Sequence, residues 1–105
     1  MGKIGGFEDR QLIEAARIWT GDDQDSWPGR HDDRLVTRFG AEAASKLLPI
    51  LEVLKADFYS SDARFVAKDL VEMTEIATLQ FKEKHPEIPG EVADLLAWCY
   101  SFSNR

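Results

Sequence analysis

The residues best suited to chemistry lie in one acidic stretch between residues 22 and 33. The stretch gathers carboxylates and one imidazole, from Asp22, Asp23, Asp25, His31, Asp32 and Asp33. Hard cations such as Ca²⁺ prefer several oxygen ligands, so such a cluster is a natural candidate for metal binding. A calcium loop of the EF-hand type needs Gly at its sixth position and Glu at its twelfth. Counted from Asp23, these positions hold Pro28 and Arg34, so the spacing predicts no tight metal site.

The acidic stretch has three further interpretations. It can be a solvated loop without a partner, which is the usual meaning of such charge, or a weak metal site. It can also be a docking surface for a basic protein, which Trp27 favours because an aromatic residue among charges is typical of interface hot spots. Trp98 is a further candidate, because one helix of a small bundle cannot bury all the aromatic residues of the segment A-W-C-Y-S-F. The candidate partner-binding residues are therefore Asp22, Asp23, Asp25, Trp27, His31, Asp32, Asp33 and Trp98.

Motifs for catalysis are absent from the sequence. His31 and His85 are the only histidines, and neither has a second ligand at the spacing that helical metal sites use. A Ser-His-Asp site built from Ser60 or Ser61 with His85 would lack the strand-turn-helix context of a nucleophile elbow. No Gly-rich phosphate loop is present. We therefore expect no enzymatic activity, no cofactor and no metal.

The composition is typical of a folded, acidic protein. Hydrophobic residues make up 44% and charged residues 30% of the chain, which are ordinary globular values. The formal charge of -6 argues against nucleic-acid binding, because phosphate contacts need clustered Lys and Arg. Cys99 is the only cysteine, and neither a signal peptide nor an apolar span of about 18 residues is present. We expect a cytoplasmic protein that binds no membrane.

The hydrophobic periodicity predicts an all-α fold, a bundle of four main helices in a single domain over residues 1–105. These helices are expected over 7–20, 41–59, 62–85 and 91–102, and the pattern allows a fifth, short helix over 33–39. Residues 1–6 are expected to be flexible and 21–32 to form the acidic loop. No segment alternates long enough to predict a strand. Pro49 either kinks the second main helix or breaks it.

The helix over 62–85 is predicted to be the central one, because apolar residues occupy two of its faces. The first stripe has i, i+4, i+7 spacing and contains Ala63, Val66, Leu70, Met73, Ala77 and Phe81, with Leu70 and Met73 expected to be buried at its middle. The second stripe contains Phe65, Ile76 and Leu79. One partner helix cannot cover both faces. The second stripe therefore packs inside the bundle or contacts another chain.

The leading hypothesis for function is a non-enzymatic protein-binding domain that presents the acidic loop to a basic partner. In size, charge and lack of disulfides, the chain resembles the general type of bacterial nuclease-immunity and antitoxin proteins, which implies an inhibitor-like role. The alternative is a structural homo-oligomer, a dimer that pairs through the apolar flanks at Phe65, Ile76, Leu79 or Trp98. A small-ligand binder or an enzyme ranks third.

Overall fold

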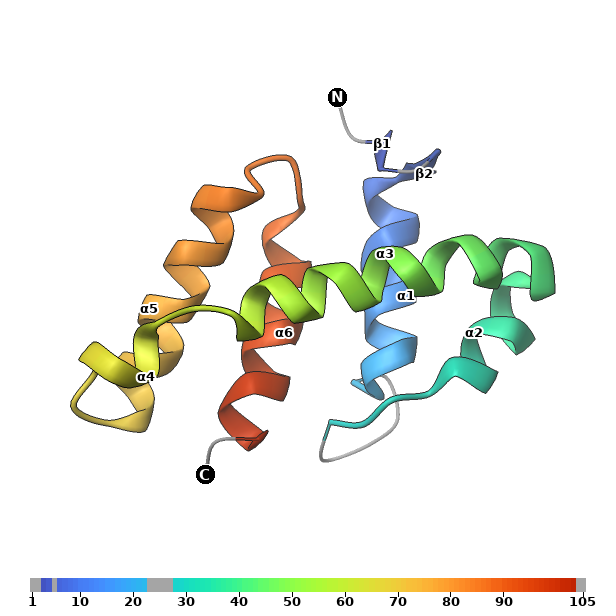
Figure 1. Ribbon diagram of the computed structural model, residues 1–105. Helices are drawn as coiled ribbons and strands as arrows, with labels where there is room; N and C mark the ends of the chain where they lie inside the picture. The colour runs from blue at the N-terminus through green and yellow to red at the C-terminus, as the bar shows by residue number, and fades with distance from the viewer. Residues whose placement is uncertain (1–2, 5, 23–27, 104–105) are drawn as a thin grey trace.

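The protein is an all-α helical bundle, as the periodicity predicts. A computed structural model describes residues 3–4, 6–22 and 28–103. Its helices are α1 (Asp9–Thr20), α2 (Asp32–Phe39), α3 (Ala41–Tyr59), α4 (Ala63–Val66), α5 (Leu70–Lys84) and α6 (Gly90–Ser103). Helices α5, α6 and α1 stand side by side, and α3 crosses them and contacts all three (Figure 1). Helix α2 lies at the beginning of α3 and α4 at its far end (Figure 1).

Buried side chains from all six described helices form one core cluster. At its centre the ring centroid of Phe58 lies 5.4 Å from those of both Phe81 and Tyr100. Burying one such aromatic side chain stabilises the fold by about 1.5 to 3 kcal/mol. Helices α1, α3 and α6 supply most of the buried residues, among them Leu12, Ala16, Trp19, Leu47, Leu51, Leu54, Phe58, Val92, Leu95, Leu96 and Cys99. Within the described part of the chain, no helix is both long enough and apolar enough to cross a bilayer.

The N-terminal segment differs from the expectation that the chain contains no strand. Strand β1 (Lys3–Ile4) pairs antiparallel with β2 (Phe7–Glu8), and Gly6 with φ +88° forms part of the turn between them. Because the hairpin uses Phe7 and Glu8, α1 begins two residues later than predicted. Glu8 and Gln11 then form a reciprocal capping box at the start of α1. A pair of two-residue strands is too short to give an alternating pattern in the sequence.

Helix α3 continues through Pro49, so a break at this proline did not occur. Proline has no backbone N–H, and the carbonyl of Ser45, four residues earlier, loses its helical donor. Both Pro49 and Ser45 are exposed, so water can bind this carbonyl. The face of α3 that packs on the core therefore keeps its hydrogen bonds.

The predicted uninterrupted helix over 62–85 is wrong, because α4 and α5 are separated by residues 67–69. The carboxylate of Asp69 accepts a hydrogen bond from the Glu72 N–H at 2.8 Å, and the carboxylate of Glu72 accepts one from the Lys68 N–H at 3.0 Å. This reciprocal capping starts a new helix at Leu70. The carboxylate of Asp62, the first residue of the predicted helix, does not cap α4 and accepts a hydrogen bond from the Gln80 side chain.

The break also changes which residues face the core. The first stripe has helical spacing in the sequence, but the backbone of residues 67–69 is not helical, so the stripe does not form one continuous face and Val66 is 64% exposed. Leu70 and Met73 are only half-buried, so the prediction that they lie at the middle of the core is wrong. The core positions of this stripe are Ala63, Ala77 and Phe81. In the second stripe Ile76 is half-buried, whereas Phe65 and Leu79 are exposed.

Candidate functional site

Within the predicted acidic loop, Asp32 is held by groups of the fold. The indole Nε1 of Trp19 donates to Asp32 Oδ1 at 2.8 Å, and the Nε of Arg30 donates to the same oxygen at 3.0 Å. Arg30 also binds Glu52 of α3. Hydrogen bonding from Arg30, and secondarily from Trp19, holds the pKa of Asp32 below its ordinary range, although desolvation opposes this. Asp32 at the start of α2 thus binds α1 directly, and Arg30 connects it to α3.

The other predicted loop residues do not converge on one point in the described structure. Asp33 is exposed in the first turn of α2. His31 is half-buried, and its backbone N–H donates to the carbonyl of Trp19 at 2.9 Å. Asp23, Asp25 and Trp27 lie outside the described residues.

The structure does bring Asp22 and Trp98 together. They line a hollow of about 270 Å³ whose other walls include Arg17, Glu91 and Asp94. The half-buried indole of Trp98 beside carboxylates could accept a cationic side chain. One cationic side chain already lies in this hollow, because the Nε of Arg17 is 3.9 Å from a carboxylate oxygen of Asp22. Among the described residues, no group of three or more His, Cys, Asp and Glu side chains is placed to hold a metal ion.

His85 connects α3 to the turn before α6. Its Nε2 lies 2.8 Å from a carboxylate oxygen of Asp57, and its Nδ1 lies 3.5 Å from that of Glu87. Ser60 donates its hydroxyl to the backbone carbonyl of Asp57 at 2.7 Å. Both imidazole nitrogens thus face carboxylates. The contact of His85 with Asp57 ties the end of α3 to the end of α5, and so does the hydrogen bond that Lys84 Nζ donates to the Ser60 hydroxyl at 3.4 Å.

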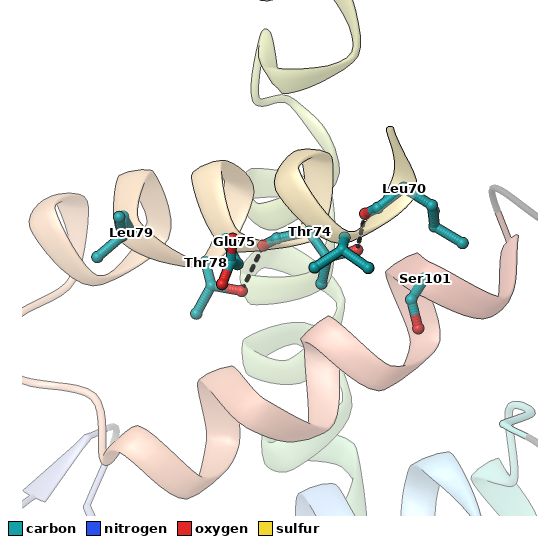
Figure 2. Close-up of a pocket in the computed structure, with 7 residues that line it drawn as sticks. Leu70, Thr74, Glu75, Thr78, Leu79 and Ser101 are labelled. Atoms are coloured by element: carbon teal, nitrogen blue, oxygen red, sulfur yellow. Dashed lines mark hydrogen bonds between the residues drawn. The ribbon is translucent and has the colours of Figure 1, made fainter. Parts of the chain in front are cut away.

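A larger hollow, of about 690 Å³, runs along α5 (Figure 2). Ser101 of α6 forms its far side, and six residues of α5 form the rest, Leu70, Val71, Thr74, Glu75, Thr78 and Leu79. We call this hollow the α5 groove. Figure 2 shows Leu70 and Leu79 towards its opposite ends, with the two threonines between them.

The threonines make the α5 groove more apolar than its composition implies. The hydroxyl of Thr74 donates to the carbonyl of Leu70 at 2.9 Å, and that of Thr78 donates to the carbonyl of Thr74 at 2.7 Å. Each hydroxyl proton is therefore used inside α5 (Figure 2). Glu75 is the one charged residue among the described lining residues. The α5 groove thus offers few hydrogen-bonding groups to an occupant.

Two aliphatic side chains of the α5 groove are exposed to solvent. Val71 is 69% and Leu79 63% exposed. The sequence identified Leu79 as a candidate interface residue, but missed Val71, Thr74, Glu75 and Thr78. A usable signal was present, because the Asp69-x-x-Glu72 capping pattern marks a helix start. Within α5, Val71 and Leu79 are eight residues apart and about 80° apart around the helix axis, so both lie on the same side of the helix.

Comparison with known proteins adds no relative to this description. No protein-family model matches the chain, and neither the curated proteins nor the solved structures contain a significant match to it.

Proposed function

We propose that the chain is a non-enzymatic protein-binding domain whose binding surface is the α5 groove and the exposed residues beside it. The observation that carries this proposal is the exposure of Val71 and Leu79 at the rim of an apolar groove. Covering apolar surface yields about 25 cal/mol for each Å² removed from water. Grooves between helices commonly bind the apolar face of a partner helix.

The chemistry of the α5 groove favours a protein over a small polar ligand. Small-molecule sites orient their ligands with a few convergent polar groups. Here the hydroxyls of Thr74 and Thr78 donate to their own helix, and Glu75 is exposed rather than enclosed. A partner helix needs few polar contacts, because its backbone groups are already hydrogen-bonded to one another.

A second candidate function is the docking of a basic protein by the acidic surface. The hollow that joins Asp22, Glu91 and Asp94 to Trp98 supports it, together with the formal charge of -6. Such a surface would steer a basic partner electrostatically, and its binding would weaken as salt is added.

Site-specific photo-crosslinking in the cells that make the protein tests both candidates. A photoreactive side chain is placed at Leu79, at Asp94, or at Val53 of α3, an apolar control position that is 57% exposed. We expect one defined polypeptide to be captured at Leu79 and not at Val53. A defined adduct only at Asp94 would favour the acidic surface. The absence of an adduct at Leu79, or identical products at all positions, would contradict binding at the α5 groove.

A further inference from the structure

We propose that the partner of this surface is a second copy of the chain, with the two α5 helices packed antiparallel around a twofold axis beside Leu79. This inference rests on the proposed function, because it names the partner of the same surface. The argument comes from the residues along the outer face of α5 and from their charges.

Four residues form one stripe on the outside of α5. Glu75, Thr78, Leu79 and Lys82 have i, i+3, i+4, i+7 spacing, which places them on one side of a helix. Glu75, Leu79 and Lys82 are exposed, and Thr78 is half-buried. We call these four residues the α5 stripe. It has an apolar centre with a negative charge at one end and a positive charge at the other.

Among the side chains that the structure describes, neither charge of the α5 stripe has a partner. In the described residues, Glu75 and Lys82 form no ion pair and no side-chain hydrogen bond. They are seven residues apart, about 10 Å along the helix axis, which is too far for them to pair with each other. Each charge is therefore available to a second molecule.

An antiparallel pairing of two copies satisfies both charges. When Thr78 of one chain lies opposite the partner's Leu79, Glu75 lies opposite the partner's Lys82, and the twofold axis repeats both contacts. The outcome is a central apolar contact between two opposite-charge pairs. A parallel pairing would oppose Glu75 to Glu75 and Lys82 to Lys82, which is unfavourable. Isologous contact needs such self-complementarity, and the stripe has it.

The α5 groove gives the central contact a place to fit. Thr78 lines the groove beside Leu79, and its hydroxyl is bonded to the Thr74 carbonyl. A small residue with its hydroxyl turned to its own backbone leaves space for the partner's Leu79, as a knob enters a hole between packed helices. The net negative charges of the two copies repel each other at longer range. This repulsion is screened over about 8 Å at physiological ionic strength, whereas the Glu75–Lys82 pairs are in contact.

Sedimentation equilibrium of the full chain over a range of concentrations tests this pairing. We expect a reversible dimer that Leu79→Asp converts to a monomer, while circular dichroism shows the same helix content because Leu79 is exposed. Glu75→Lys alone and Lys82→Glu alone should each raise the dimer dissociation constant by at least about tenfold, because each places like charges opposite one another. The combined variant Glu75→Lys/Lys82→Glu should return to within about threefold of the original constant.

Lys46→Glu is the matched control, since Lys46 is an exposed lysine of α3 with no ion pair among the described residues. It should leave the dissociation constant unchanged. A dimer that the combined variant does not restore would overturn the antiparallel pairing. A monomer at every concentration, together with capture of a different polypeptide at Leu79, would overturn self-association and leave the proposed binding function standing. A monomer without any adduct at Leu79 would overturn both.

Discussion

Asp32 belongs to the predicted docking loop, but its carboxylate forms hydrogen bonds within the protein that stabilise the fold. It accepts hydrogen bonds from both Trp19 and Arg30, and these bonds fix the beginning of α2 against α1. An acidic side chain that already has two donors is less available to a partner than the exposed Asp33. The sequence shows the clustering of carboxylates, but the difference between these neighbours depends on Trp19, thirteen residues away from Asp32.

Replacing Asp32 by Asn should lower the free energy of unfolding at neutral pH by about 0.5 kcal/mol, a small effect because the pair with Arg30 is partly solvated. The pKa of Asp32 is lowered in the folded state, so its carboxylate contributes stability above the unfolded pKa. That contribution is lost as the pH falls through the folded pKa. In urea titrations, the difference between Asp32→Asn and the original chain should therefore begin to narrow below about pH 4, the unfolded pKa, and close below the folded pKa. Asp33→Asn is the control; a difference that grew towards acid pH would contradict this account.

At the scale of elements, the division between α4 and α5 shows where a periodic pattern misleads. The apolar stripe from Ala63 to Phe81 keeps helical spacing across residues 67–69, although the chain there is not helical. The hydrogen bonds of Asp69 and Glu72 cap a new helix at Leu70, and this capping replaces continuation of the helix from Val66. Periodicity reports which residues are apolar at regular intervals, whereas capping decides where a helix begins.

Asp69→Ala tests this division directly. Loss of an N-cap carboxylate costs about 0.5 to 2 kcal/mol, so the free energy of unfolding in urea should fall by that amount. A continuous helix through residue 69 would give the opposite sign, because Ala is the better helix former. Glu83→Ala, an exposed change in the same helix, should stay within about 0.5 kcal/mol.

Pro49 supports a second prediction about an element. The proline removes one hydrogen bond within α3 and strains the preceding turn, so Pro49→Ala should raise the free energy of unfolding by about 1 to 3 kcal/mol. Thermal and urea melts both measure this change. A loss of stability would show that proline restrains the unfolded chain more than it disturbs the helix.

At the scale of the whole molecule, the all-α bundle and most of its core follow from the sequence. The ranges of α3 and α6 are predicted closely, at 41–59 and 91–102, because the apolar residues of each helix recur with helical spacing. The α5 groove is not predictable in this way. It depends on how α5 and α6 approach each other and on where the hydroxyls of Thr74 and Thr78 point, which are tertiary features.

Truncations should separate the core from the proposed interface. Phe58 is fully buried, so Phe58→Ala should cost about 3 to 5 kcal/mol, a large part of the 5 to 15 kcal/mol typical of a small domain. Leu79→Ala should cost less than about 1 kcal/mol at concentrations where the chain is monomeric. Its cost should grow with protein concentration if the native dimer is stabilised by mass action. A loss of several kcal/mol for Leu79→Ala in dilute solution would place Leu79 in the core.

The environment of Trp19 makes this residue a built-in optical probe. Its indole is 1% exposed, and the side-chain charges of Arg30 and Lys55 each lie 5.6 Å from its ring centroid. An indole sealed from water emits at shorter wavelength than a hydrated one. In a variant that carries Phe at positions 27 and 98, the emission of Trp19 should shift to the red when α1, α2 and α3 separate. Because the α5 stripe lies on another helix, the emission wavelength of Trp19 should not change when two chains associate. Unfolding and dimerisation can therefore be followed separately in one sample.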